Sequence, residues 1–256
     1  MGEAGKPTDW ITMKIDPEIF EELGVRDPEE TKREMAITKK TRQVTKELKT
    51  DPDNVDLQIE LATLMIDGAN YEEAIKNLKV IRNKAPKSAR VHKLLGTAYV
   101  LFNHEEEGML ELNRACELDP TDAENFFNLG GLYLLRDMYQ NAMEAFEKVI
   151  ELDPTDTTAY ANLAAAYDML KLYDKTIIAL RKVLMFTPED KELRAALSNA
   201  YFNAERYEEA IDAAQVVVEI DDKDPQAYCN LGSCYSVCNM IDDAISAFKK
   251  ASELAP

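Results

Sequence analysis

Few residues in this 256-residue chain have the chemistry to bind a metal or to act as a nucleophile. Cys229, Cys234 and Cys238 lie within ten residues, but no CxxC pair occurs. Neither histidine, His92 or His104, is near them in sequence, and unpaired thiols of this kind usually serve as small buried side chains in a reducing compartment. Since no phosphate-binding glycine loop, nucleophile elbow or zinc-protease motif occurs either, we expect no metal, no cofactor and no catalytic residue.

Asparagine is the second residue type whose chemistry and spacing stand out. Asn230 follows Asn162 at twice the interval that separates Asn162 from Asn128. A carboxamide carries both donors and an acceptor, so it matches a peptide bond without reading a particular side chain. What these residues do depends on the elements that position them.

The same 34-residue interval runs through most of the chain. One leucine recurs six times at that interval, and a small residue follows it each time. The leucines are Leu61, Leu95, Leu129, Leu163, Leu197 and Leu231. Each unit closes with a proline or an aspartate, such as Pro120 or Asp222. The chain is therefore an array of repeats, in which each unit buries its apolar face against its neighbours.

Within a unit, apolar residues follow helical spacing in two groups separated by a short polar turn. In the third unit the first group includes Phe126 and Tyr133, and the second includes Ala142 and Phe146. This pattern predicts a helical hairpin, and since no segment alternates like a strand, the predicted class is all-α. Proline should end each hairpin, and an adjacent Asp or Thr should cap the next helix.

Period, composition and punctuation together resemble the tetratricopeptide repeat family. The resemblance implies a right-handed α-solenoid of six 34-residue helical hairpins with an N-terminal capping helix. The hairpin units are 55–88, 89–122, 123–156, 157–190, 191–224 and 225–256.

The residues before the first unit do not fit the repeat. Asp27 and Pro28 form a strong helix start, which predicts a capping helix over 28–50 with a narrow apolar stripe at Ile37, Val44 and Leu48. Residues 1–27 are expected to form a partly flexible N-terminal arm. Its apolar cluster consists of Trp10, Ile11, Met13 and Ile15. The arm either folds loosely on the first hairpin or docks in a groove, of its own chain or of a partner.

The opposite end has no capping helix in this sequence, because the last unit closes at Pro256. Either the chain is an excerpt of a longer protein, or another copy covers the face that carries Ile245, Phe248 and Leu254. Head-to-tail contact of that kind propagates unless its symmetry closes.

One face of the first helices is poor in charge. Unit positions 2, 6, 9 and 13 point away from the packing face, because a helix turns 100° per residue. In the third to sixth units these sixteen residues are Glu124, Asn128, Gly131, Leu135, Thr158, Asn162, Ala165, Met169, Glu192, Ala196, Asn199, Asn203, Gln226, Asn230, Ser233 and Val237. We call them the charge-poor face, since two are charged whereas the whole chain is 30% charged. Depletion of charge on an accessible face is typical of a protein-binding surface.

In the family that the chain resembles, this face lines a concave groove that binds peptides. The asparagines stand where members of the family grip an extended peptide backbone, and the alternative interpretation is that they are ordinary polar surface. The expected peptide-binding residues are Lys93, Thr97, Leu101, Asn128, Leu135, Asn162, Met169, Asn199 and Asn230.

A related device of the family clamps the two carboxylates of a chaperone C-terminus. The corresponding residues here are Lys93, Thr97, Asn128, Thr158 and Asn162. One of three expected cations is present, and Lys93 alone cannot offset the desolvation of two carboxylates, so binding of a chaperone C-terminus is disfavoured.

The charge and the apolar content limit the partners. A net charge of −18 disfavours nucleic acid and anionic membranes, which attract clustered Lys and Arg, and favours neutral or basic protein partners. No apolar run is long enough to cross a bilayer, and the first ten residues lack the apolar stretch of a secretory signal, so we expect a cytoplasmic protein.

Three functions fit these observations. The favoured one is a non-catalytic scaffold that binds an extended segment of a partner in the groove. The second is a structural protein that self-assembles into homo-oligomers through uncapped terminal repeats. The third is the targeting region of a larger enzyme or co-chaperone.

Overall fold

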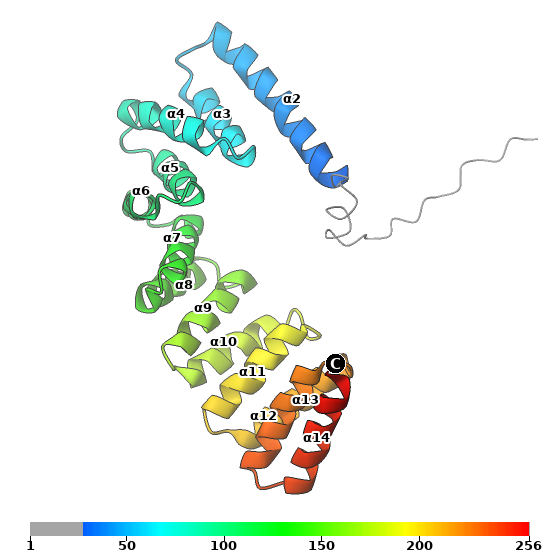
Figure 1. Ribbon diagram of the computed structural model, residues 1–256. Helices are drawn as coiled ribbons and strands as arrows, with labels where there is room; N and C mark the ends of the chain where they lie inside the picture. Colours follow the sequence, from blue (N-terminus) through cyan, green and yellow to red (C-terminus); the bar gives the residue numbers. More distant parts are fainter. Residues whose placement is uncertain (1–27, 256) are drawn as a thin grey trace, which may run out of the picture. The chain divides into compact units, whose positions relative to one another are not determined.

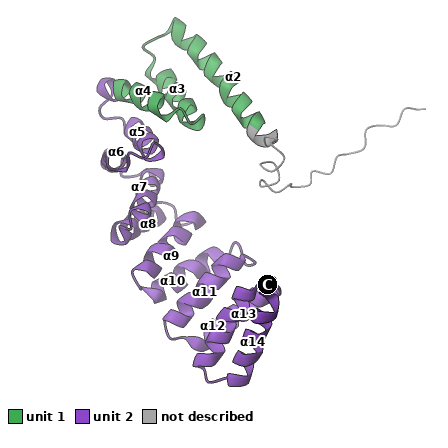
Figure 2. Ribbon diagram, viewed as in Figure 1, with its two compact units in different colours: residues 1–81 green, residues 82–256 purple. Residues whose placement is uncertain are grey.

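The computed structural model describes residues 28–255, and this part of the chain contains thirteen α-helices and no strand (Figure 1). The predicted all-α solenoid is confirmed. The expected arm at 1–27, with its apolar cluster and Asp27, and the closing Pro256 lie outside the described residues. The chain divides into two compact units, residues 1–81 and 82–256 (Figure 2).

The described part of the first unit consists of α2 (Pro28–Thr50), α3 (Val55–Asp67) and most of α4 (Tyr71–Lys84). Helix α2 packs against α3, as expected of a capping helix. Val44 is buried, and Ile37 and Leu48 are half-buried. The narrow apolar stripe of α2 therefore covers an apolar face of the first hairpin that would otherwise meet water.

The second unit is a stack of helical hairpins. Its helices are α5 (Ala89–Leu101), α6 (Glu105–Leu118), α7 (Ala123–Leu135), α8 (Tyr139–Leu152), α9 (Thr157–Met169), α10 (Tyr173–Leu184), α11 (Lys191–Asn203), α12 (Tyr207–Ile220), α13 (Pro225–Val237) and α14 (Ile241–Leu254). The two helices of each hairpin contact each other, and the second helix contacts the first helix of the next hairpin. The odd-numbered helices are the first helices of the hairpins. Equivalent faces of these helices therefore follow one another along the stack.

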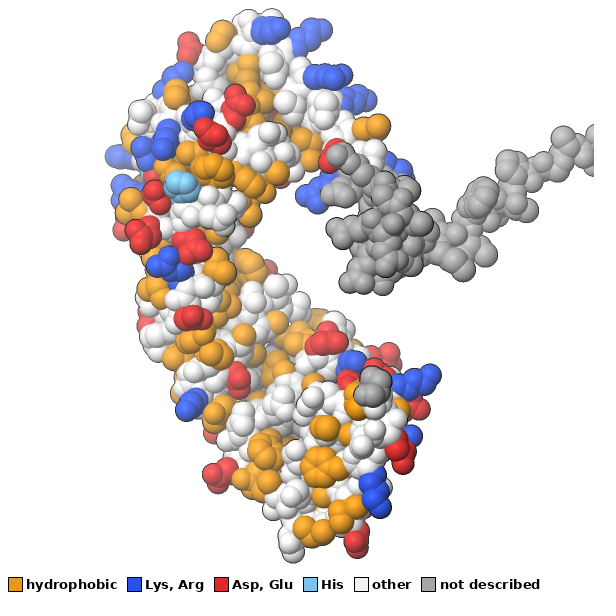
Figure 3. Space-filling model, viewed as in Figure 1, with side chains coloured by type: hydrophobic (Ala, Val, Ile, Leu, Met, Phe, Trp, Pro, Cys, Tyr) orange, Lys and Arg blue, Asp and Glu red, His pale blue; other side chains and the backbone are white. Residues whose placement is uncertain are grey.

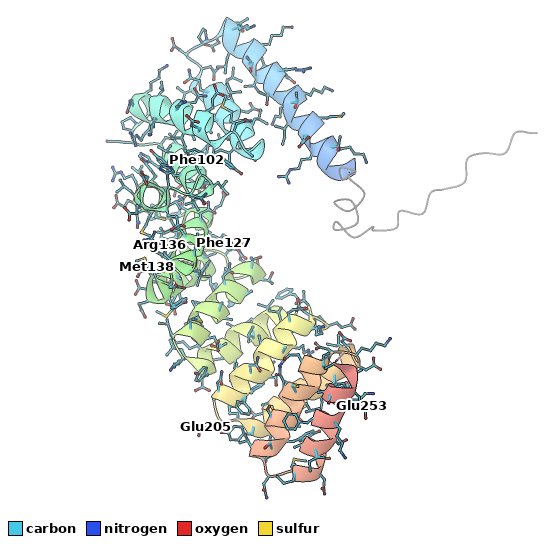
Figure 4. The ribbon with its side chains drawn as sticks, in the orientation of Figure 1. Phe102, Phe127, Arg136, Met138, Glu205 and Glu253 are labelled. Carbon is cyan, nitrogen blue, oxygen red and sulfur yellow. The ribbon has the colours of Figure 1, made fainter. Side chains whose placement is uncertain are left out.

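The repeated residues form the packing between the helices. The recurring leucine is buried in every hairpin of the second unit. In the third hairpin a Cβ on Gly130 would lie 2.9 Å from Cζ of Phe146, so a side chain at this position of α7 would displace the ring that packs there from α8. Phe146 is fully buried, and its ring packs edge-on against Phe127, which projects from α7 (Figure 4).

Two different devices connect the helices. Before each first helix, a side chain accepts a hydrogen bond from a backbone N–H of the first turn. The capping residues recur with the period of the repeat, at Asn54, Ser88, Asp122, Asp156, Asp190 and Asp224. Inside each hairpin, one residue instead has a left-handed backbone conformation, such as Glu205 with φ of 60° between α11 and α12 (Figure 4). The next N–H then bonds back to the last turn of the first helix, as from Arg206 to the carbonyl of Tyr201 at 2.9 Å.

Candidate functional site

The charge-poor face is accessible along α7, α9, α11 and α13. Twelve of its sixteen residues are exposed, and the four at unit position 6 are half-buried. The position-6 residues are Asn128, Asn162, Ala196 and Asn230. Since consecutive first helices contact each other from α5 to α9 and from α11 to α13, residues at equal positions on them lie in a row.

The four asparagines expected to bind a peptide differ in their hydrogen bonding. The Oδ1 atom of Asn230 accepts a bond from Nε2 of Gln226 at 2.9 Å. Within the described residues, the carboxamides of Asn128, Asn162 and Asn199 have no hydrogen-bond partner. Because Asn128 and Asn162 are also half-buried, they hold unused donors and acceptors in a partly desolvated position, where a bond to a ligand is worth most.

Apolar side chains stand next to the asparagines. Leu101, Leu135, Met169 and Val237 end their helices at position 13 and are 47%, 62%, 54% and 48% exposed. A Cβ on Gly131, one turn after Asn128, would meet nothing within 4 Å, so the backbone of α7 is open there. The face therefore combines amides that can bind a peptide backbone with apolar groups that can contact its side chains.

The two expected site residues on the first part of α5 have partners within the protein. Nζ of Lys93 pairs with Asp122 at 3.2 Å and with Glu124. Burial lowers the pKa of Lys93, but its hydrogen bonds to Glu124 and Asp122 outweigh the burial and raise it overall. The hydroxyl of Thr97 donates to the carbonyl of Lys93 at 3.0 Å. A carboxylate ligand would have to compete with two internal acids for Lys93.

The cysteines are free thiols without a metal-binding arrangement. The described residues include no group of three or more His, Cys, Asp and Glu side chains that could hold an ion. Burial raises the pKa of Cys116 to about 11, and it also raises the pKa of Cys234. Both therefore stay protonated at neutral pH, in the form that is neither nucleophilic nor a metal ligand.

One buried charge network was missed by the sequence analysis. Glu111 of α6 is 6% exposed and accepts from Arg82 and from Nδ1 of His92 at 2.6 Å. The other ring nitrogen of His92 lies 3.1 Å from the carbonyl of Pro86. A signal was present: Glu111 stands at unit position 23, where the next four units have alanine.

Comparison with known proteins agrees with this architecture. Five family models described as tetratricopeptide repeat match residues 42–98, 123–156, 145–177, 176–227 and 225–256. The chain belongs to the tetratricopeptide repeat family. No curated protein matches its sequence.

Solved structures share the fold at low sequence identity. YrrB, described as a TPR protein with an unusual peptide-binding site, is 20% identical with a TM-score of 0.64, over 70% of this chain and 92% of YrrB. MamA from Desulfovibrio magneticus RS-1 is 24% identical with a TM-score of 0.59, over 65% of this chain and 94% of its own. A tetratricopeptide repeat protein from Parabacteroides merdae is 17% identical with a TM-score of 0.56, over 93% and 90% of the two chains.

The length and apolar character of a helix decide whether it can cross a membrane. Among the residues that the structure describes, none of the helices combines the length and the apolar character needed to span a bilayer.

Proposed function

We propose that this tetratricopeptide repeat protein is a non-catalytic scaffold that binds an extended peptide segment of a partner along the charge-poor face. The proposed contacts centre on Asn128 and Asn162, with Leu101, Leu135 and Met169 beside them. Asn199 and Asn230 extend the site toward α13. Lys93 and Thr97 lie at its other end and contribute only if the ligand displaces their internal partners.

The observation that carries the proposal is the pair of unpartnered, half-buried carboxamides on α7 and α9. Two packed helices lie about 8–10 Å apart, and an extended chain rises about 3.3 Å per residue, so roughly three ligand residues separate the two amides. Each amide would then bond one peptide unit, and the intervening side chains would reach Leu135 and Met169.

The comparisons support a protein-interaction role. Tetratricopeptide repeats are interaction modules, and YrrB, which shares the fold, is described as having a peptide-binding site. The net charge of −18 favours a neutral or basic partner and disfavours nucleic acid. The free thiols suit the reducing cytoplasm as the compartment.

The test is a double variant of the two central amides. Peptides that bind the wild-type chain are first selected from a random library, and their affinities are then measured by calorimetry. Asn128→Ala with Asn162→Ala should weaken binding by about 1–3 kcal/mol, because each lost amide leaves a ligand peptide group unpaired.

The matched control is Asn141→Ala on α8, an exposed asparagine away from the charge-poor face. This variant should bind like the wild type. Unchanged affinity in the double variant, with its circular dichroism and melting temperature retained, would rule out the amide row as the site.

Self-assembly is a second candidate, favoured by the outer face of α14. Ile245 and Phe248 are 48% and 42% exposed, whereas the equivalent Ile177 and Leu180 of α10 are buried by the next hairpin. Figure 3 shows hydrophobic side chains gathered over α13 and α14. Light scattering should show a mass that grows with concentration, and Phe248→Glu should reduce it; a strict monomer at every concentration would exclude this function.

A further inference from the structure

A groove lies among α10, α11 and α12, and no residue of the charge-poor face lines it. It has a volume of about 500 Å³ and is lined by residues of α10, α11, α12 and the adjoining turns. Three arginines line it, Arg181, Arg194 and Arg206, in a chain that is otherwise strongly acidic. Leu184, Leu197 and Val216 provide apolar wall.

The groove is separate from the proposed peptide site. Its residues on α11 include Arg194 and Leu197, which are spaced for one helical face. Asn199 of the charge-poor face lies about 200° around the same helix from Leu197. A ligand in one site therefore leaves the other open.

The three guanidinium groups are not equally engaged. Arg206 pairs with Glu209, and its Cζ lies 4.8 Å from the ring centre of Tyr201. Arg194 donates from Nε to the carbonyl of Pro188 at 2.8 Å, which fixes its side chain and leaves the terminal nitrogens available. Arg181 is exposed and has no ion-pair partner among the described residues.

The preceding hairpin contains an equivalent groove, which acts as an internal reference. Its nine lining residues, on α8, α9 and α10, each stand one repeat before a lining residue of the arginine groove. There Glu147 stands in place of Arg181, and it accepts a hydrogen bond from Tyr167 at 2.6 Å and pairs with Lys175 at 3.6 Å. That groove satisfies its own charges.

The change from an acid at position 147 to a base at position 181 alters which hydrogen bonds the groove can form. Arg181 has only donors, so it cannot accept a bond from Tyr201 as Glu147 accepts one from Tyr167. Within the described residues no hydrogen bond joins Arg181 to Tyr201. Because arginine stands at position 181, where the preceding hairpin has Glu147, the contact between hairpins is lost and a cation faces the groove.

We propose that the groove between α10, α11 and α12 binds an acidic segment of a protein. A carboxylate of that segment bonds Arg181 and Arg194, and a neighbouring apolar side chain packs on Leu184, Leu197 and Val216. The ligand is a carboxylate rather than a phosphate because Glu209 and Asp212 also line the groove. With the three arginines they leave the lining a net charge of +1, which a single carboxylate balances and a phosphate near −2 exceeds.

This preference is opposite to that of the charge-poor face, for which a neutral or basic segment is proposed. It also agrees with the local charge, since α10 carries Lys175, Arg181 and Lys182 against one acid, Asp174. One partner with segments of both kinds, or two partners, could then bind the same hairpins together.

The test measures the fluorescence anisotropy of a labelled short peptide of alternating aspartate and leucine. Wild-type chain should bind it saturably, and Arg181→Glu should weaken binding by about tenfold or more, because a charge-assisted bond becomes a repulsion. Lys182→Glu is the matched control: it makes the same charge change at the next exposed residue of α10, which does not line the groove.

Each outcome decides the proposal. Support requires loss with Arg181→Glu, retention with Lys182→Glu, and retention with the Asn128→Ala, Asn162→Ala double variant, which separates this site from the proposed function. Equal losses in the two charge variants would reduce the effect to general electrostatics and overturn the proposal. Absence of saturable wild-type binding, equal binding of an asparagine–leucine peptide, or tighter binding of a phosphoserine–leucine peptide would overturn it as well.

Discussion

The third and sixth hairpins present the same packing pair in different surroundings. In α7 and α8, Gly130 faces Phe146, and in α13 and α14, Gly232 faces Phe248. Phe146 is fully buried, because α9 packs on α8, whereas Phe248 is 42% exposed, since no described helix packs on the outer face of α14. The contribution of a residue in this array therefore depends on the neighbouring hairpin as much as on its own.

The largest effect is expected from replacing each of the two phenylalanines with alanine. Phe146→Ala should destabilise the chain by about 3–5 kcal/mol, because it removes a fully buried ring and leaves a cavity. Phe248→Ala removes a ring that water already reaches in part. Its destabilisation should therefore be well under half of that caused by Phe146→Ala. Urea unfolding followed by circular dichroism measures both. Equal losses in dilute solution would mean that the outer face of α14 is covered.

The comparison extends to position 23, where the third and sixth hairpins have Ala145 and Ala247 and the second has Glu111. Glu111→Ala should cost about 3 kcal/mol, because it leaves Arg82 and the buried His92 without their acceptor.

A surface acid on the same helix provides the control for this variant. Glu117→Ala breaks only an exposed pair with Arg114 and should leave the unfolding midpoint unchanged. A neutral effect of Glu111→Ala would show that the network does not contribute to stability.

The smallest expected effect concerns the hairpin turns, which are alike in all units. Glu205 and Asn103 both have φ of 60°, a conformation that glycine adopts freely and asparagine tolerates. Glu205→Gly should therefore raise stability by about 0.5–1 kcal/mol. Asn103→Gly should change it little, and a gain of the same size in both would assign the effect to something other than backbone strain. Melting temperatures distinguish these outcomes.

Much of the fold could be predicted because the repeat amplifies weak local signals. A helix start such as Asp156 is ambiguous alone, but the same kind of cap in every unit leaves little choice. The face on which Asn128 and Asn162 lie also followed from helical geometry, since it requires only the direction of a residue on its own helix. Their half-burial did not, because it depends on neighbouring helices.

Contacts between hairpins could not be predicted in the same way. Lys93 reaches Asp122 and Glu124 at the start of the next hairpin, and nothing in its own helix indicates this. Arg181, Arg194 and Arg206 look like scattered surface cations in the sequence, and they line one groove only because α10, α11 and α12 pack together.

The sequence by itself determined the all-α class, the hairpin period, the caps and the charge-poor face, because these depend on local periodicity and on one residue's direction from its helix axis. The tertiary structure alone decided which charges are buried, which carboxamides stay unpaired and which groove keeps an unneutralised cation. Those properties depend on distances between side chains of different hairpins, and such distances are fixed only when the apolar faces pack.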